Sequence, residues 1–476
     1  MNKYETLKYY FGYDKFRPMQ EDIIDTILNK ENVMCILATG GGKSLCFQVP
    51  GLMMEGLTIV ITPLISLMCD QVKHLKEKGI SAMYLNSTQR YSEQLEVLKC
   101  VRNNKIKFLY VAPEKFNNRM FIDAINDCVV SQITLDEAHC ISVYGHDFRV
   151  DYANISKFLG FLSKRPVVSA FTATASQSVI NDIKECCNVD FKIFKSTFDR
   201  PNLYYETIQS NDEIKDLKLL LDKYSDEQVL VYCLTRRQTE SLYYRLDKES
   251  YSLALYHGGL DSQTKSYYQD LFLSKKKKIM IATSSFGMGI DGVIRVVINM
   301  GFPMSLEDLS QQQGRAGRDN KESYCYMIYN MKDLYYNEYF INAVDDLALD
   351  KDTKKLVKKV KREKLREVIG YAQTKRCLHE YLVSHFGELY MSYCCKCSNC
   401  NRNTKTIDYI KEARLVVDTL KLTKEKYGTN IVSKIIVGSK ENSIKEKYLN
   451  KIKTYNKSYH SINEIKNVIS NMVSDG

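Results

Sequence analysis

Short apolar runs alternate with longer amphipathic stretches along most of this chain, and the alternation occurs twice. In the first half, runs typical of buried strands occupy residues 32–38, 57–62, 108–112, 132–135 and 167–172. In the second half, they occupy residues 229–233, 253–256, 279–282, 296–299 and 323–329. Strands that alternate with helix-length segments, such as residues 66–78, predict parallel sheets covered by helices. We therefore expect an α/β fold class with two units, each built on one parallel sheet.

Residues 198–207, with the sequence FDRPNLYYET, are the expected linker between the two units, because proline breaks regular structure. Apolar periodicity returns near the end of the chain, in residues 413–422 and 462–472. We see no repeat of short period, which excludes a solenoid. The predicted segments are 1–205 and 206–340 for the two α/β units, 341–403 for a cysteine-containing module and 404–476 for a last helical domain.

Composition and charge favour a polyanionic partner. The chain has 476 residues, with 68 Lys and Arg against 57 Asp and Glu, and a formal net charge of +11. A positive field attracts nucleic acid but does not distinguish DNA from RNA. There is neither a bilayer-length apolar run nor a signal peptide, so we expect a soluble intracellular protein with no membrane partner. Most of the 15 cysteines stand singly in apolar runs, as buried free thiols do.

A glycine-rich turn, ATGGGKS at residues 38–44, follows the first predicted strand. Its glycines allow backbone N–H groups to approach phosphate oxygens, Lys43 would meet the β- and γ-phosphates, and Ser44 would coordinate Mg²⁺. The strict P-loop pattern has glycine where this chain has Leu37, so a turn that only caps a helix is the alternative. The residues predicted to bind nucleotide here are Thr39, Gly40, Gly41, Gly42, Lys43 and Ser44.

The sequence DEAH at residues 136–139 closes another apolar run. Asp136 would hold Mg²⁺ through water, and Glu137 would orient and deprotonate the attacking water. An isolated acidic pair after a strand could instead be a solvated turn. The preceding P-loop argues against that alternative, and the two motifs together predict hydrolysis of a nucleoside triphosphate.

The second unit lacks a P-loop but carries TSSFGMGID at 283–291 and QQQGRAGRD at 311–319. Arg315 and Arg318 lie three residues apart on a helix or turn that begins near Gly314. Arg318 could reach the γ-phosphate across a cleft as an arginine finger in cis. Two arginines on a solvated face are the alternative. The flanking glycines and the P-loop of the other unit favour the catalytic interpretation.

Taken in order, these motifs resemble those of the RecQ family of superfamily 2 helicases. FGYDKFRPMQ at 11–20, TPLISLMCDQV at 62–72, SAFTATA at 169–175 and YHGGL at 256–260 follow the family order. The resemblance covers nearly the whole chain and implies two RecA-like lobes, a helical zinc-binding module and a partial winged-helix domain. It also implies ATP and Mg²⁺ as cofactors, 3′-to-5′ movement on DNA, and contacts from Arg17 and Gln20 to the adenine and phosphate side of the nucleotide.

The same resemblance places an aromatic-rich loop that senses single-stranded DNA in residues 141–149. Tyr144 and Phe148 could stack on bases, which is worth about 1–3 kcal/mol per base, while His146 and Arg149 would contact phosphate or relay the contact. Tyr144 stands where the family typically has tryptophan, so we expect coupling to Glu137 that survives in weaker form. The alternative is that Tyr144 and Phe148 are core aromatics.

A cysteine cluster follows the second unit and predicts a closed structural zinc site with Zn–S bonds of about 2.3 Å. The predicted ligands are Cys377, Cys394, Cys397 and Cys400. The spacing alone also permits an iron–sulfur cluster, whereas the resemblance favours Zn²⁺. Cys395 could compete as a ligand, as could His379 or His385 with less reason. Because the site would be closed, its role would be in folding.

Two basic runs, residues 275–278 and 351–368, are either solvated faces or phosphate contacts. Residues 404–476 resemble the opening helices of the family's winged helix without the β-hairpin wing, so we expect weak unwinding or unwinding of short duplexes. We predict an ATP-dependent DNA helicase acting on single-stranded and duplex DNA. An RNA helicase is the first alternative, against which the aromatic loop and zinc module argue. A scaffold with a decayed motor is the second, against which the intact motor residues argue.

Overall fold

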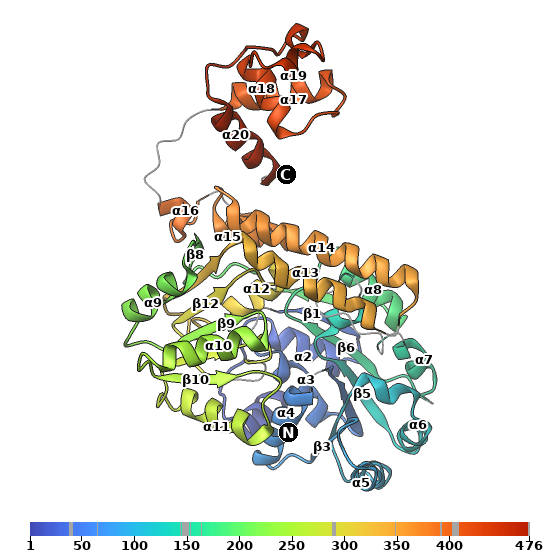
Figure 1. Cartoon of the computed structure of the whole chain (residues 1–476). Helices are drawn as coiled ribbons and strands as arrows, with labels where there is room; N and C mark the ends of the chain where they lie inside the picture. Colours follow the sequence, from blue (N-terminus) through green and yellow to red (C-terminus); the bar gives the residue numbers. More distant parts are fainter. Residues whose placement is uncertain are drawn as a thin grey trace.

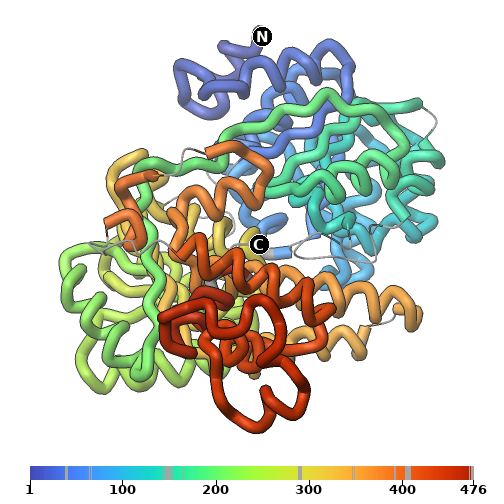
Figure 2. Tube along the Cα trace, turned by 90° about the horizontal axis from the view of Figure 1, so that it is seen from above, coloured from blue at the N-terminus to red at the C-terminus, as the bar shows by residue number. Residues whose placement is uncertain are grey.

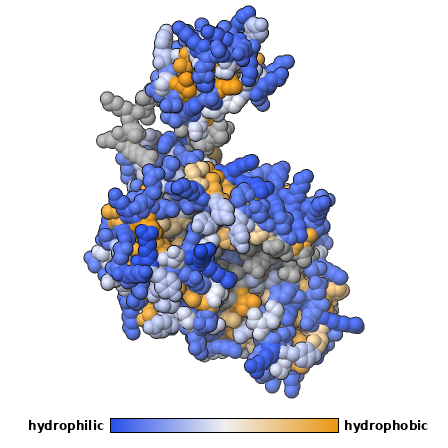
Figure 3. All heavy atoms as spheres, viewed as in Figure 1, coloured by the Kyte–Doolittle hydropathy of each residue, from blue (hydrophilic) through white to orange (hydrophobic). Residues whose placement is uncertain are grey.

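A computed structural model describes residues 1–37, 41–63, 65–142, 144, 152, 154–162, 164–287, 292–347, 349–390, 393–401 and 409–474. Two α/β lobes lie side by side, with helices of a third region and a small helical domain above them in the view of Figure 1. The predicted fold class is therefore confirmed. Among the described residues, no helix is both long and apolar enough to cross a membrane. The face drawn in Figure 3 is mostly hydrophilic with scattered apolar areas.

The first lobe contains a parallel sheet in the order β3-β4-β2-β5-β6-β1-β7. Its strands are β1 Val33–Ile36, β2 Leu57–Ile61, β3 Ala82–Leu85, β4 Phe108–Val111, β5 Val130–Leu135, β6 Val167–Thr172 and β7 Lys192–Lys195. The five predicted strands are all present. The two edge strands, β3 and β7, were not predicted, because edge positions leave side chains partly exposed and interrupt the apolar run.

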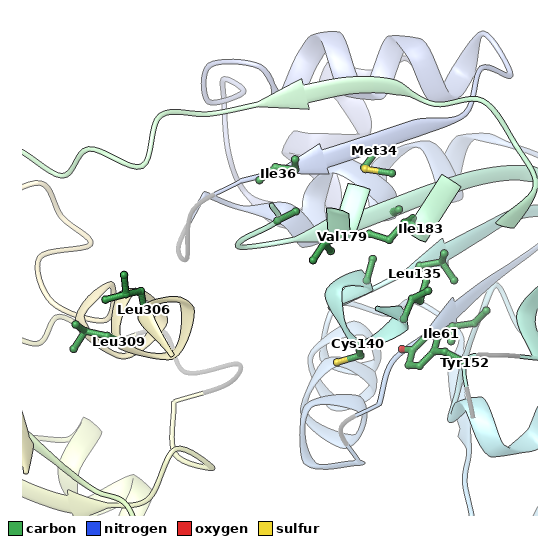
Figure 4. Packing of buried hydrophobic residues seen from close by; sticks show 14 of the residues in the cluster. Met34, Ile36, Ile61, Leu135, Cys140, Tyr152, Val179, Ile183, Leu306 and Leu309 are labelled. Carbon is green, nitrogen blue, oxygen red and sulfur yellow. The ribbon is translucent and has the colours of Figure 1, made fainter. Parts of the chain in front are cut away.

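Helices cover both faces of this sheet. They are α1 Lys3–Thr6, α2 Gln20–Leu28, α3 Lys43–Met53, α4 Ile65–Glu77, α5 Tyr91–Arg102, α6 Arg119–Asn126, α7 Ile155–Gly160 and α8 Gln177–Cys187. Figure 4 shows Met34 and Ile36 of β1 near Val179 and Ile183 of α8, with Leu135 of β5 beside them. Burial of these apolar side chains fixes the strands so that their carboxyl ends, where the phosphate loop and the DEAH segment begin, open at one edge of the sheet.

The second lobe contains a parallel sheet in the order β10-β11-β9-β12-β13-β8. Its strands are β8 Leu203–Gln209, β9 Val229–Cys233, β10 Leu253–Tyr256, β11 Ile279–Ala282, β12 Val296–Met300 and β13 Ser323–Tyr329, and its helices are α9 Glu213–Lys223, α10 Arg236–Asp247, α11 Ser262–Leu273 and α12 Leu306–Gln313. The linker predicted at 198–207 was wrong in part, since β8 starts at Leu203. Alternate β8 residues are buried against β13, and the strand begins two residues after Pro201.

Two helical regions complete the chain. The third region contains α13 Leu334–Asn342, α14 Lys351–Gln373, α15 Leu378–His385 and α16 Ser398–Asn401; the last contains α17 Ile410–Leu422, α18 Thr429–Val437, α19 Asn442–Lys445 and α20 Ile462–Ser474. Helices α17, α18 and α20 enclose a small core of their own, and α20 also contacts α14. The described part of the last domain is helical, as its apolar periodicity predicted.

Candidate nucleotide, nucleic-acid and zinc sites

The described part of the phosphate loop begins at Gly41, and Thr39 and Gly40 lie outside the described residues. Gly42 caps the start of α3 with φ +75°, a left-handed conformation that favours glycine. A Cβ at Gly42 would also collide with Nε2 of Gln20, which donates to the Gly42 carbonyl at 3.1 Å. The Arg17 backbone N–H donates to Oε1 of Gln20 at 2.8 Å. The structure thus brings Arg17 and Gln20 together at the phosphate loop.

The acidic pair lies beside Lys43, at the same edge of the sheet. Nζ of Lys43 is 3.8 Å from Oε1 of Glu137, and both Asp136 and Glu137 are buried. Burial and then the negative charge of Glu137 raise the pKa of Asp136 to about 7, while Lys43 lowers it. Two adjacent buried carboxyl groups fit a divalent cation, which would favour their ionised forms. Ser44, the other predicted Mg²⁺ ligand, opens α3 next to Lys43.

His139 ties the DEAH segment to β6, a link that sequence reasoning missed. Its Nδ1 is 3.0 Å from Oγ1 of Thr172 and 3.4 Å from Oε2 of Glu137. The Thr172 hydroxyl donates to the Thr174 carbonyl at 2.8 Å, so it must accept from His139, and Nδ1 therefore carries the proton. The recurrence of threonines in SAFTATA was the available signal, but it did not identify this partner.

The second-lobe arginines lie in a turn that follows α12, which we call the arginine turn (residues 314–318). Arg315 is buried, and its Nη1 donates to the Gly287 carbonyl. Burial raises the pKa of Tyr232, and the charges of Arg315 and Arg318 act in the opposite direction, so both guanidinium groups lie near this phenol. The prediction of a helix or turn near Gly314 is confirmed as a turn. These arginines and the phosphate loop belong to different lobes.

A small cavity of about 20 Å³ lies where the lobes meet. Ala173 and Thr174 line it from the first lobe, and Ser310, Gln311 and Gly314 line it from α12 and the arginine turn. Such a volume holds about one water molecule. The segments SAFTATA and QQQGRAGRD therefore face each other across the lobe interface.

Of the predicted nucleic-acid contacts, only Tyr144 belongs to the described residues; His146, Phe148 and Arg149 lie outside them. The Tyr144 side chain is 40% exposed, so the interpretation of this residue as a core aromatic is wrong. Its backbone N–H donates to Oγ of Ser142 at 3.0 Å, and that hydroxyl donates to Asp182 of α8. The exposed Tyr144 ring, on a backbone fixed by this hydrogen bond, is available to stack on a nucleic-acid base.

The four predicted zinc ligands form one cluster in which all Sγ atoms lie within 4.8 Å of one another. The Sγ atoms of Cys394 and Cys400 are 3.8 Å apart, the separation of about 3.8 Å that a tetrahedron with 2.3 Å Zn–S bonds requires. Backbone N–H groups of Leu378 and Cys400 donate to Sγ of Cys397 at 3.5 and 3.4 Å, which stabilises a thiolate. The thiols therefore fit a single Zn²⁺.

The three competing ligands are not part of this cluster. Cys395 is exposed. His379 lies with Nδ1 3.2 Å from Oδ1 of Asp199 and Nε2 3.0 Å from the Leu203 carbonyl. His385 lies between two carboxylates, those of Glu307 on α12 and Glu367 on α14. The histidines thus bind the module to the second lobe and to the segment between the lobes.

Several basic side chains of α14 form ion pairs within the protein. Lys358 forms an ion pair with Asp345 at 2.6 Å, and Arg362 forms one with Glu338 at 3.1 Å. Lys364 pairs with Glu307 at 2.7 Å in a nearly buried contact. These partners favour a structural interpretation of this run over phosphate binding for the paired residues.

Comparison with known families matches four successive segments of the chain. They are a DEAD/DEAH box helicase model at 17–183, a helicase conserved C-terminal domain at 212–320, a RecQ zinc-binding model at 331–401 and an RQC domain at 403–476. The zinc-binding match covers all four clustered cysteines, so two independent observations identify this cluster as a zinc site.

Similar proteins include the ATP-dependent DNA helicase RecQ of Bacillus subtilis, 36% identical over 473 residues that cover 98% of this chain and 79% of the relative. The ATP-dependent DNA helicase RecQ of Pasteurella multocida is 33% identical, and the match covers 94% of this chain and 69% of the relative. A putative ATP-dependent RNA helicase of Acanthamoeba polyphaga mimivirus is 36% identical, and the match covers 99% of this chain and 86% of the relative.

Solved structures with a similar fold include the DUF1998 helicase MrfA bound to DNA, with a TM-score of 0.59 at 17% identity, covering 80% of this chain and 54% of MrfA. Dbp5 of S. cerevisiae bound to RNA and ADP BeF3 gives a TM-score of 0.57 at 17% identity, and the match covers 76% of this chain and 97% of Dbp5. At this identity, the likeness concerns the fold alone. It supports the two-lobed architecture derived above.

Proposed function

The chain belongs to the RecQ family of superfamily 2 ATP-dependent DNA helicases, and from that premise we propose that it couples ATP hydrolysis to 3′-to-5′ movement along single-stranded DNA and to duplex unwinding. The observation that carries the proposal is the meeting of Lys43, Asp136 and Glu137 at one sheet edge, next to the described glycines of the phosphate loop. This is the constellation that phosphoryl transfer to water needs.

Each motor residue has a distinct proposed role. Lys43 and the glycine backbone bind the phosphates of ATP, and Gln20 with Arg17 binds the nucleotide beside them. Glu137, whose Oε2 lies 3.4 Å from Nδ1 of His139, orients and deprotonates the attacking water. Ser44 and Asp136 would hold Mg²⁺, which would supply positive charge against the negative charge that develops on the phosphates.

We further propose that Arg318 stabilises transition-state charge from the second lobe, while Arg315 supports the arginine turn. The burial of Arg315 and its hydrogen bond to the Gly287 carbonyl support a structural role for that residue within its own lobe. A group that acts across a lobe interface acts only when the lobes close, so hydrolysis would depend on closure.

For the nucleic-acid side, we propose that Tyr144, Phe148, His146 and Arg149 sense a strand and report to Glu137. The exposed ring of Tyr144 follows Glu137 closely in sequence, which supports a short path between them. We also propose that the second lobe begins near residue 203 rather than 206, because β8 belongs to its sheet. The zinc module at 341–403 and the last domain at 404–476 would then contribute further contacts to DNA.

The experiment that tests the partner measures ATP turnover without nucleic acid, with single-stranded DNA, and with RNA of the same sequence and length. We expect strong stimulation by DNA and much weaker stimulation by RNA. Stronger stimulation by RNA than by DNA would favour an RNA helicase, the activity in the name of the mimivirus relative. No turnover in any of the three would favour a scaffold with a decayed motor.

Polarity needs a separate assay with two partial duplexes that differ only in the end that carries the single-stranded tail. We expect unwinding of the substrate with a 3′ tail. Unwinding of the 5′-tailed substrate alone would overturn the proposed direction and leave the proposed hydrolysis intact.

A further inference from the structure

The segment between the lobes, residues 196–202, is here called the hinge. Figure 2 shows the chain crossing from the first lobe to the second in this region. The hinge starts beside the phosphate loop, because β7 pairs with β1 and the Ser196 backbone N–H donates to the Ile36 carbonyl at 2.9 Å. It ends at Asn202, immediately before β8 begins at Leu203.

Two hinge side chains bind the backbone of the arginine turn. Nη2 of Arg200 donates to the carbonyls of Ala316 at 3.1 Å and Gly317 at 3.0 Å. Nδ2 of Asn202 donates to the Gly317 carbonyl at 2.9 Å and to that of Lys321 at 3.0 Å. Arg200 Nε also donates to Oδ1 of Asn202 at 3.4 Å. The carbonyls that lie between Arg315 and Arg318 are therefore held by the hinge.

The turn fits against the hinge without spare room. Gly317 has φ +57°, and a Cβ there would collide with Nδ2 of Asn202 and come within 2.8 Å of Oγ of Ser323. The backbone N–H of Gly317 donates to the Ile294 carbonyl at 3.0 Å, so the other side of the turn is bound to the second lobe. A turn fixed from both sides presents its next side chain, that of Arg318, in a defined direction.

We infer that Arg200 is a positioning residue for the arginine turn. It connects the hinge, which is anchored one strand away from the phosphate loop, to the two carbonyls that precede Arg318. The inference rests on the proposed role of Arg318 in hydrolysis. The effect of Arg200 passes through the backbone of the turn and not through contact with the nucleotide.

Arginine suits this task better than lysine. One planar guanidinium can donate to two neighbouring carbonyls and to Asn202 in a rigid arrangement, whereas an ammonium on a flexible stem fixes fewer directions. Removal of Arg200 should leave ATP binding by the first lobe intact and misplace Arg318. Misplacement of a catalytic group by about 1 Å can cost about 100-fold in rate.

The test compares Arg200→Met and Arg200→Lys with a matched control, Arg165→Met. Arg165 also donates to a backbone carbonyl, that of Asn188 at 3.0 Å, in the first lobe. With saturating single-stranded DNA, we expect Arg200→Met to lower kcat by about 10- to 100-fold with an unchanged KM for ATP. Arg200→Lys should recover part of that loss, and the control should match the unsubstituted chain. An unchanged kcat in Arg200→Met would overturn the inference.

A double-substitution cycle with Arg318→Ala separates the inference from the proposed function. If Arg318→Ala leaves kcat unchanged, the proposed finger role fails. If Arg318→Ala lowers kcat and Arg200→Met lowers it no further in that background, Arg200 acts through the turn. A full additional loss in that background would show an independent role and overturn the inference. If Arg200→Met also lowers Tm, Asn202→Ala replaces it in the same cycle, with the same two outcomes.

Discussion

Individual residues carry the chemistry of the first lobe, and Lys43 and Glu137 can be tested separately. We expect Lys43→Ala to lose phosphate charge stabilisation and Glu137→Gln to lose water activation, each lowering kcat by about 100- to 1,000-fold or more. Glu137→Gln should still bind a fluorescent ATP analogue. Lys8→Ala, at an exposed ion pair with Asp14, is the control that should keep full turnover. Near-normal hydrolysis by a folded Lys43 or Glu137 variant would remove these assignments.

Tyr144 offers a direct reporter of the strand, because the chain contains no tryptophan. In Tyr144→Trp, the single indole should be quenched when single-stranded DNA binds, since bases stack on exposed aromatic rings. Tyr91→Trp, also at an exposed tyrosine, is the control that should change little. We expect Tyr144→Ala to lose stimulation by DNA and keep basal turnover. An equal loss of both rates would instead indicate a structural role for Tyr144.

At the scale of single residues, the sequence predicts those functional residues that belong to short motifs with a defined spacing. Lys43, the acidic pair and the four cysteines are of this kind, and the structure brings each group together. His139 and Arg200 could not be predicted, because their roles depend on partners brought close only by the sheet order and the hinge. Nothing in the sequence around Arg200 indicates that it faces the carbonyls of residues far along the chain.

Among the elements, fully buried strands were predictable, including β10 at the edge of the second sheet, and partly exposed edge strands were not. Central strands of a parallel sheet are buried on both faces and read as continuous apolar runs, whereas β3 and β7 are partly exposed. β8 was not predicted, because buried and partly exposed residues alternate along it and it gives no continuous apolar run. The preceding Pro201 also indicated a linker. The pairing of β8 with β13 overrides that local signal.

A buried charge network joins α12 to α14 and α15, and it yields an element-scale prediction. Glu307 pairs with Lys364 at 2.7 Å, and Nε2 of His385 is 3.6 Å from the same carboxylate oxygen. Burial raises the pKa of Glu307, but His385 and Lys364 outweigh it and hold that pKa well below its usual range. The carboxylate is therefore ionised at neutral pH, and its stabilising effect is lost progressively as the pH falls below the ordinary pKa of a glutamate and through this lowered pKa.

We expect Glu307→Gln to destabilise the protein by about 3–5 kcal/mol, because it leaves a nearly buried ammonium without its partner. The double variant Glu307→Gln with Lys364→Met should recover most of that loss. Calorimetric unfolding measures both variants at neutral pH. If the single and double variants are equally destabilised, packing rather than charge joins these helices. If neither is destabilised, the network contributes nothing to stability.

In the whole molecule, the zinc module is bound to the end of β7 and to the hinge as well as to its own metal site. Lys195 donates to the Phe386 carbonyl at 2.7 Å, and Glu388 accepts from the Phe198 backbone N–H at 3.0 Å. The rings of Phe198 and Phe386 stack with centroids 4.1 Å apart. Cys377 stands at the start of α15, and these contacts begin where α15 ends. Folding of the module and geometry of the hinge are therefore physically connected.

This connection determines what loss of zinc should do. We expect one Zn²⁺ per chain by metal analysis, and Cys397→Ser should lower the zinc content, the soluble yield and the affinity for DNA, because an incomplete thiolate site cannot supply the free energy that folds the module. Besides the cluster that both lobes share with the module, each lobe has a core cluster of its own, so far-UV circular dichroism should keep most of its signal. Cys395→Ser is the matched control, since that exposed thiol is outside the cluster, and it should retain zinc and DNA binding. Iron with labile sulfide in the purified protein, or a folded and fully DNA-binding Cys397→Ser chain without metal, would contradict the zinc assignment.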